Sequence, residues 1–302
     1  LAVMRSGRLH RYNAAADEKT ETELLELEFA ESLGVPYCLA CTSGGYALHI
    51  AMRAAGVKVG DQVLCNAFTL APVPGAIHNS GATPVLVDVA EDYCIDLEHL
   101  EAQAHASGAK FFMLSHMRGH IADMERIVEI CQRYGIFLIE DCAHTMGASW
   151  NGVNSGTFGD IACFSTQTYK HINSGEGGFL PTRDAEVMAK AIIYSGSYML
   201  FERHLAAPPK EVFEKIRFET PNYSGRMDNL RAAILRPQLQ DLKRQCERWN
   251  ARYVLLETAF HQSAAISIPQ RHTKEQFVAS SIQFSVPAFS RQQIQALVDK
   301  CA

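Results

Sequence analysis

The sequence predicts an α/β fold with a mainly parallel sheet flanked by helices, followed by a smaller domain. Between Thr20 and Leu180, short apolar segments alternate with segments of helical periodicity, which is typical of parallel strands joined by crossover helices. Small or polar residues follow several of these apolar segments, as they do where functional groups gather at strand ends. A length of 302 residues, 47% hydrophobic and 20% charged, suits one large domain with an appendage.

The first predicted elements form a helix, a strand, a turn and a second helix. The first helix spans Thr20 to Leu33, and a strand follows from Tyr37 to Cys41. The turn Thr42 to Gly45 then leads into a helix from Tyr46 to Ala55. A small, glycine-containing turn at a helix start can bind phosphate through free amides and the helix dipole, although an ordinary turn uses the same residues.

Four further strands alternate with helices along the chain: Val63–Asn66, Pro84–Val87, Lys110–Ser115 and Ile136–Ile139. Helices are predicted from near Pro72 and from Asp123 to Tyr134. The last of the four strands stops at Glu140 and Asp141. Asp141 is either the cap of a helix that starts near Ala143 or a buried carboxylate that pairs with a cation.

Lys170 lies in the segment that organises the rest of the chain. A buried strand, Ile161 to Phe164, ends at Ser165, and the lysine follows five residues later. The glycine-rich run from Gly175 to Gly178 permits close backbone approach, and Phe179 begins a second strand. By itself, Lys170 is either a solvated loop lysine or an amine presented to a site at the strand ends.

From Asp184 onward the pattern is mostly helical. A helix is predicted over Met227 to Leu242, continuing through Arg252, and Ile266 to Pro287 holds two short apolar runs before a last helix, Arg291 to Cys301. We therefore predict a large domain over 1–225 and a smaller α+β domain over 226–302. The sequence opens on Leu1 and stops within a predicted helix, so we expect the smaller domain to be incomplete.

Charge and composition exclude several classes of partner. The formal net charge is −5 with interspersed signs, so no basic surface is expected to bind nucleic acid. No apolar run reaches membrane-spanning length, and the first ten residues lack the apolar core of a signal peptide. We expect a soluble, cytoplasmic protein with no membrane partner, in which anions are bound by local amides or arginines.

The cysteines and histidines predict neither disulfides nor a metal. Nine scattered cysteines are an odd number, and Cys38 and Cys41 form a C-x-x-C within an apolar strand, which favours a buried reduced pair. The twelve histidines show no H-E-x-x-H spacing, and no second cysteine pair has zinc spacing.

A phosphate-binding turn, an acid at a strand end and a downstream lysine are what a pyridoxal-phosphate enzyme needs. With these parts in place, the chain resembles the DegT/StrS family of sugar aminotransferases, which have the aspartate-aminotransferase-like fold of type I. The resemblance runs from about Arg5 to the end of the sequence. Its matching motifs are SGRL (Ser6–Leu9), TSGGYAL (Thr42–Leu48), VGDQVL (Val59–Leu64), GATPVLVDV (Gly81–Val89), EDCAHTMGA (Glu140–Ala148), GTFGD (Gly156–Asp160), FSTQTYKHINSGEGG (Phe164–Gly178) and RMDNLRAAI (Arg226–Ile234).

The resemblance implies roles for individual residues. Lys170 would attach the cofactor covalently and move a proton during transfer, because a desolvated lysine beside other cations has a lowered pKa. Asp141 would pair with the pyridinium nitrogen, and His144 would stand beside the phenolic oxygen, where the family usually has glutamine. The remaining implied cofactor contacts are to the phosphate group: Gly44, Gly45 and Ser165 from the same chain, and Asn222 from a neighbouring chain, which would make the active unit a homodimer.

Several residues depart from the family pattern. Gly45 stands where the family often has threonine, and Leu70 stands where an aromatic residue usually stacks on the cofactor ring. Phe68 is nearby, but alternation along a strand would point it to the other face. Ser224 is a rival of Asn222 for the phosphate contact, because extra residues separate Asn222 from Arg226.

The most informative departure is Arg118, which replaces a common aromatic residue in a segment near the substrate. We hypothesise that Arg118 holds an anionic acceptor, since its planar fork suits carboxylate or phosphate, with His116 as a second substrate residue. The alternative is an arginine that pairs with a surface acid.

The resemblance therefore implies a pyridoxal-phosphate aminotransferase. It would move an amino group from glutamate or glutamine to an acceptor, which would be a nucleotide-linked keto-sugar or a cyclitol. One alternative is a dehydratase of the same family, in which histidine stands where this chain has Lys170. Another is a regulatory or binding protein that has kept the fold without the chemistry. No G-x-G-x-x-G follows the first strand, which disfavours an unrelated dinucleotide-binding enzyme.

Overall fold

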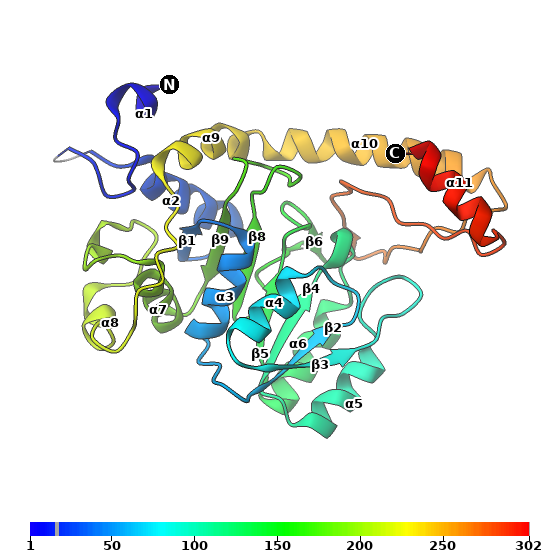
Figure 1. Cartoon of the computed structure of the whole chain (residues 1–302), viewed down its shortest axis with the longest axis horizontal. Helices are drawn as coiled ribbons and strands as arrows, with labels where there is room; N and C mark the ends of the chain where they lie inside the picture. The colour runs from blue at the N-terminus through cyan, green and yellow to red at the C-terminus, as the bar shows by residue number, and fades with distance from the viewer. Residues whose placement is uncertain (16–17, 302) are drawn as a thin grey trace.

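The computed structural model describes residues 1–15 and 18–301 and is built around a seven-stranded sheet. The strand order is β1-β9-β8-β5-β4-β2-β3, and all strands run parallel except β9, which is antiparallel to both neighbours (Figure 1). The strand bounds are β1 Tyr37–Cys41, β2 Gln62–Asn66, β3 Thr83–Val87, β4 Phe111–Ser115, β5 Phe137–Asp141, β8 Ile161–Ser165 and β9 Gly178–Thr182. The predicted α/β class and the predicted strands are confirmed.

Alternating burial explains why helices cover both faces of the sheet. In β1, Leu39 and Cys41 pack with one group of helices, whereas Cys38 and Ala40 pack with another, because successive side chains point to opposite faces. The first group is α3 (Gly44–Ala54), α4 (Pro72–Asn79) and α7 (Ala185–Ser195). Cys38 and Ala40 pack with α2 (Glu21–Leu33), and farther along the sheet α5 (Leu97–Ser107) and α6 (Met124–Tyr134) pack with residues of β2, β4 and β5.

Local sequence sets the helix ends. The Thr20 hydroxyl accepts a hydrogen bond from the Glu23 amide, and the Glu23 side chain accepts one from the Thr20 amide, so α2 begins with a capping box. At the starts of α5, α6 and α7, an aspartate side chain accepts a hydrogen bond from a backbone amide in the first turn. Each of these four helices ends at a glycine with positive φ, where a side chain would be strained.

The C-terminal part corrects one prediction. Instead of one helix over Met227 to Arg252, the chain forms α9 (Asn229–Gln240) and α10 (Leu242–His261). The break falls at Asp241, whose φ of −97° and ψ of 0° leave the helical region. Periodicity alone does not reveal this break, because apolar residues continue across it.

The C-terminal segment also contributes to a second sheet. β10 (Glu275–Gln276) pairs with β6 (Ser149–Trp150), which pairs with β7 (Val153–Asn154). Figure 1 shows α10 running along one side of the molecule, with α11 (Arg291–Cys301) at its far end. The division at residue 225 stays a prediction. The remaining short elements are α1 (Ala2–Ser6), η1 (Met117–Gly119), η2 (Phe201–Arg203) and α8 (Lys210–Glu214).

Cys38 and Cys41 are buried and carry free thiols, as predicted. Within the described residues, the structure contains no helix with the length and apolar composition needed to cross a membrane.

Candidate functional site

A cavity of about 350 Å³ opens at the carboxyl ends of the parallel strands. It collects side chains from the ends of β4, β5 and β8 and from the first turn of α3, which is where ligands bind in open α/β sheets. Six of the seven predicted cofactor residues line it: Gly44, Gly45, Asp141, His144, Ser165 and Lys170.

The N-terminus of α3 forms one end of the cavity. Ser43 caps the helix by accepting a hydrogen bond from the Tyr46 amide at 3.0 Å. Gly44 and Gly45 occupy the first two helical positions, whose amides have no acceptor within the helix. A Cβ at Gly44 would lie 2.7 Å from Ser165 Cβ, so only glycine allows these two chain segments to meet. This end of the cavity can accept an anion through amides, the Ser165 hydroxyl and the helix dipole.

Asp141 supplies the negative charge in the middle of the cavity wall. One carboxylate oxygen accepts a hydrogen bond from the Ala143 amide at 3.2 Å, and the other accepts from Ser115 Oγ at 3.1 Å. Burial raises the pKa of Asp141, although these two donors and the charge of Lys170 oppose the shift. The described residues leave this buried carboxylate without a directly bonded cation, so a cationic ligand group would be bound strongly here.

Lys170 and His144 line the same cavity and contact each other. Lys170 Nζ lies 3.2 Å from His144 Nε2. Burial lowers the pKa of Lys170, Asp141 raises it and Arg118 lowers it, with a net downward shift. Burial, with the charges of Lys170 and Arg118, lowers the pKa of His144 to about 3. The imidazole is therefore neutral near pH 7, and its Nε2 can accept a hydrogen bond from the lysine.

Four other predicted residues do not line the cavity, and one of them is Arg118, whose half-buried side chain belongs to η1. His116 is buried, 1% exposed, and bonds to Glu140 instead of facing the cavity. Asn222 is exposed, and its side-chain oxygen accepts hydrogen bonds from the amide and hydroxyl of Ser224. Phe68 packs against Tyr93 with ring centroids 5.7 Å apart, so Leu70 is the residue of this segment that lines the cavity.

Sequence reasoning missed several cavity residues, of which Ser115 is the most informative. Ser115 is the residue directly opposite Asp141 in the pairing of β4 with β5, so the register places its hydroxyl beside the carboxylate. The Asn66 side chain fixes Ser115 by bonding to both its amide and its carbonyl, each at 2.9 Å. The sequence did contain a signal for this contact: Asn66, Ser115 and Asp141 are polar residues, and each stands at the end of a predicted strand. Met117, Ala143, Gln167 and Glu176 also line the cavity.

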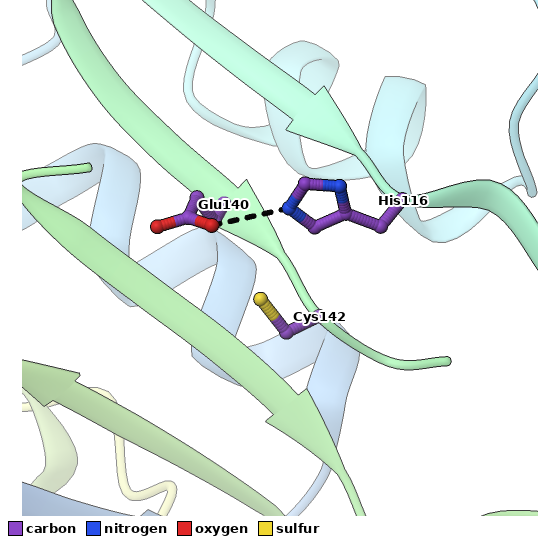
Figure 2. A group of neighbouring side chains, drawn as sticks. All are labelled: His116, Glu140 and Cys142. Atoms are coloured by element: carbon purple, nitrogen blue, oxygen red, sulfur yellow. Dashed lines mark hydrogen bonds and ion pairs between the residues drawn. The ribbon is translucent and has the colours of Figure 1, made fainter. Parts of the chain in front are cut away.

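Glu140 precedes Asp141 and forms a closed hydrogen-bond network on the other face of the sheet. Its carboxylate accepts hydrogen bonds from the amides of Gly156, Phe158 and Gly159 at 2.7 to 3.0 Å. His116 Nε2 lies 3.1 Å from the same carboxylate (Figure 2). The GTFGD segment thus wraps around Glu140, which explains its glycines: a Cβ at Gly159 would lie 2.7 Å from the Leu138 carbonyl oxygen.

His116, Glu140 and Cys142 lie close enough to suggest a metal site, since one ligand atom of each falls within 4.8 Å of the others. Figure 2 shows the His116 nitrogen that faces Glu140 already bonded to it. Both carboxylate oxygens are also occupied by amides. Burial raises the pKa of Cys142 well above its usual value, so the thiol stays protonated and is a poor ligand. The group is better described as a structural network.

Comparisons with known proteins place this geometry in a family. The model of the DegT/DnrJ/EryC1/StrS aminotransferase family matches residues 8–301. The chain is 39% identical over 165 residues to a protein of Micromonospora echinospora named as an L-glutamine:3-amino-2,3-dideoxy-scyllo-inosose aminotransferase, covering 54% of this chain and 39% of that protein. It is 35% identical over 216 residues to a GDP-perosamine synthase of Caulobacter vibrioides, covering 71% of this chain and 55% of the relative.

A solved structure shares the fold over nearly the whole chain. The crystal structure of 3-amino-5-hydroxybenzoic acid (AHBA) synthase superposes with a TM-score of 0.84 and 27% identity, covering 99% of this chain and 74% of that one. The chain spans roughly two fifths to just over half of the length of the two curated relatives. On this family match and this shared fold, the chain belongs to the DegT/DnrJ/EryC1/StrS aminotransferase family.

Proposed function

We propose that the protein is a pyridoxal-phosphate-dependent aminotransferase that moves an amino group from glutamate or glutamine to a keto-sugar, nucleotide-linked, or to a cyclitol, in the cytoplasm. The observation that carries the proposal is the convergence of Lys170, His144 and Asp141 on one cavity whose end is the N-terminus of α3. The names of the two curated relatives support an aminated sugar or cyclitol as the product class.

The residues present fit this cofactor. Gly44 and Gly45 offer backbone amides, and Ser165 offers a hydroxyl, at the end of the cavity formed by the N-terminus of α3. A Cβ at Gly44 would collide with Ser165 there. Asp141 is a buried carboxylate that lacks a directly bonded cation among the described residues, and a pyridinium nitrogen would supply one. Lys170 is an amine with a lowered pKa, as covalent attachment to an aldehyde requires.

Each residue then has a physical task. When bound, the cofactor supplies an electron sink and carries the amino group between the two substrates. Asp141 keeps the ring nitrogen protonated, and Ser115 and Ala143 hold the carboxylate in place. Lys170 Nζ accepts and returns a proton because its pKa is lowered, and neutral His144 orients that nitrogen through Nε2. Met117, which is buried, and Leu70 supply apolar surface to the cavity lining.

We also propose that two copies of the chain share each site. Asn222 lies on an exposed segment outside its own cavity, beside three exposed apolar side chains: Tyr198, Met199 and Tyr223. A homodimer that covers these side chains would carry Asn222, or Ser224 beside it, to the phosphate end of the other cavity. The proposal explains both the exposed apolar surface and the distance of Asn222 from its own site.

The first experiment is a visible absorption spectrum of the protein with pyridoxal phosphate, before and after glutamate or glutamine is added. We expect a band that depends on Lys170 and is lost when a donor is added, because the amino group moves to the cofactor. The Lys170→Ala variant should lack the band, whereas Lys190→Ala, which lies in α7 and does not line the cavity, should keep it. Absence of the band in the unmodified protein would overturn the proposal in favour of a binding or regulatory protein.

A mixing experiment tests the shared site. Lys170→Ala and Asn222→Asp are each expected to be inactive as homodimers, because each carries a defect in both sites. When the two are unfolded together and refolded, mixed dimers should contain one site with neither defect and recover activity. If the mixture stays as inactive as its parents while the unmodified protein survives the same treatment, Asn222 acts within its own chain or not at all.

The dehydratase alternative is disfavoured by Lys170, because the resemblance places histidine at this position in such enzymes. The dehydratase alternative predicts a different product when the protein with pyridoxal phosphate is given a sugar substrate. A dehydratase would release a sugar that has lost a hydroxyl group, whereas an aminotransferase would release an aminated sugar and consume donor stoichiometrically.

A further inference from the structure

Arg118 has a backbone conformation that ordinary residues avoid. Its φ is 57° and its ψ is 20°, inside the left-handed region, within the short helix η1. Such a conformation costs on the order of 1–2 kcal/mol for a residue with a Cβ and is seen most often at functional sites. Glycine would adopt it without strain.

The surrounding structure holds the arginine in this conformation. The carbonyl of Gly119 accepts a hydrogen bond from buried Arg271 at 3.1 Å, and Arg271 forms an ion pair with Glu275 at 2.7 Å. On the other side, a Cβ at Gly119 would lie 3.0 Å from the His144 carbonyl oxygen, so the turn abuts the cavity wall. The amide of His116, two residues before Arg118, donates to the Asp141 carbonyl at 3.1 Å. The turn is thus fixed between the strand ends and the C-terminal segment.

The guanidinium of Arg118 has no partner in the described parts of the chain, 1–15 and 18–301. No carboxylate there lies within 4.0 Å of it, and no hydrogen bond from its side chain is formed. The side chain is half-buried, and its charge lowers the pKa of both Lys170 and His144. The surface ion pair considered from the sequence is therefore not present, and the unpaired guanidinium belongs to a turn whose neighbouring residues Met117 and Gly119 contact the cavity and its wall.

We infer that Arg118 binds the α-carboxylate of the amino donor, which also leaves as the α-carboxylate of the keto acid. This inference rests on the proposed function and deepens it, because it names the substrate group that the arginine recognises. It also moves the role of Arg118 from the acceptor, as hypothesised from the sequence, to the donor.

The position of the charge favours the donor. In an amino acid the carboxylate is bonded to the same carbon that carries the transferred nitrogen, so it must lie beside Lys170 Nζ. Met117, immediately before Arg118, lines the cavity, and Lys170 lies within the electrostatic reach of the guanidinium. In a nucleotide-linked sugar the nearest negative charge is the diphosphate, and a sugar ring separates it from most carbons that could be aminated. A cation beside Lys170 therefore suits the amino acid better.

Charge balance supports the same conclusion. Lys170 and Arg118 are two cationic groups near one another, and the charge of Arg118 lowers the pKa of Lys170. Asp141 is the buried carboxylate of the cavity, and pyridinium would neutralise it, whereas Glu176, which also lines the cavity, is exposed to solvent. A substrate carboxylate would then neutralise Arg118, and its planar fork could bind both oxygens.

The test uses glutarate, a dicarboxylate with no amino group, added to the full chain that has been incubated with pyridoxal phosphate so that the phosphate end is filled. Titration calorimetry should give a dissociation constant that rises at least tenfold in Arg118→Gln and by less in Arg118→Lys, which keeps the charge but loses the fork. Arg183→Gln is the matched control, since Arg183 is exposed at the far end of β9. It should bind glutarate as the unmodified protein does.

Kinetics with the donor provide the second measurement. Arg118→Gln should raise the KM for the donor at least tenfold and leave the KM for the acceptor within a factor of two. Equal glutarate binding by Arg118→Gln and Arg183→Gln, a raised KM for the acceptor alone, or no glutarate binding by the unmodified protein would each overturn the inference. Failure of the proposed function is distinguishable, because it removes the Lys170-dependent absorption band, whereas glutarate binding requires no transfer.

Discussion

Glu140 and Asp141 are adjacent acids at the end of β5, yet they lie in opposite environments. Glu140 is fully buried, and three backbone amides and His116 surround its carboxylate (Figure 2). Asp141 faces the cavity, where the Ala143 amide and the Ser115 hydroxyl leave its carboxylate partly unsatisfied. The difference follows from the alternation of side chains along a strand.

The comparison shows how to separate a structural acid from a functional one. A buried charge that meets all its donors within the fold stabilises that fold and has no capacity left for a ligand. A buried charge that meets only some of them is costly, and the cost is recovered when a ligand binds. Burial alone does not distinguish the two, whereas the count of donors does.

The largest expected effect separates the two acids directly. Asp141→Asn should lower the rate of amino transfer by at least about 100-fold, because a pre-placed charge partner is lost, with the unfolding free energy changed by less than about 1 kcal/mol. Stopped-flow loss of the cofactor band and urea unfolding measure the two quantities. If Asp141→Asn transfers the amino group at the unmodified rate, the assigned role of Asp141 is wrong.

Glu140→Gln should have the opposite profile. The amide nitrogen of glutamine would face backbone donors, so we expect the unfolding free energy to fall by about 3 kcal/mol. The cofactor band of the folded fraction should persist, because Glu140 does not line the cavity. The exposed Glu98→Gln on α5 is a matched control and should change stability by less than about 0.5 kcal/mol. A stable Glu140→Gln protein would contradict the structural role.

A smaller effect on stability is expected at Arg118, whose backbone has a strained left-handed conformation. Arg118→Gly keeps the left-handed turn, and relief of about 1 kcal/mol of strain is opposed by a similar entropic cost of glycine in the unfolded chain. The unfolding free energy should therefore stay within about 1 kcal/mol of the unmodified value while glutarate binding is lost. A large destabilisation would show that the arginine is a structural residue, as Glu140 is.

The smallest expected effect concerns pH and the histidines. Burial lowers the pKa of His144 to about 3, whereas the unfolded chain has the ordinary value near 6.5, so protons bind the unfolded state more readily. This contribution to stability is complete above pH 6.5 and is lost as the pH falls below it. Between pH 7.5 and 5.5, His144→Gln should reduce the loss of unfolding free energy by about 1 kcal/mol.

The control for this pH effect is His261→Gln, in which an exposed histidine at the end of α10 is replaced. It should follow the pH dependence of the unmodified protein. Urea unfolding at a series of pH values measures both variants. Parallel curves for His144→Gln and the unmodified protein would show that the pKa of His144 does not differ between the folded and unfolded chains.

Much of the fold and of the cavity could be predicted from the sequence. Strands such as Tyr37–Cys41 are continuous apolar runs followed by turn residues, and this signal is local. The positions of Lys170 and Asp141 followed from strand ends, because parallel strands bring their carboxyl ends to one edge.

The rest could not be predicted because it depends on which strands become neighbours. Ser115 meets Asp141 through the pairing of β4 with β5, and no local pattern sets that register. His116 was expected near the substrate, but the same alternation that directs Ser115 to Asp141 directs His116 to Glu140. The break at Asp241 depends on packing rather than on periodicity.

The reversed strand β9 has a consequence for how this fold can change over evolution. The chain leaves β8 at Ser165 and returns as β9 at Gly178, and these two residues pair directly. The amide of Thr166 donates to the Gly177 carbonyl at 2.9 Å, so the excursion that carries Lys170 is closed at its base. A loop tied in this way tolerates exchange at its tip without loss of its anchorage. The side chain at position 170 can therefore be exchanged while the sheet, the N-terminus of α3 and the buried Asp141 keep their places.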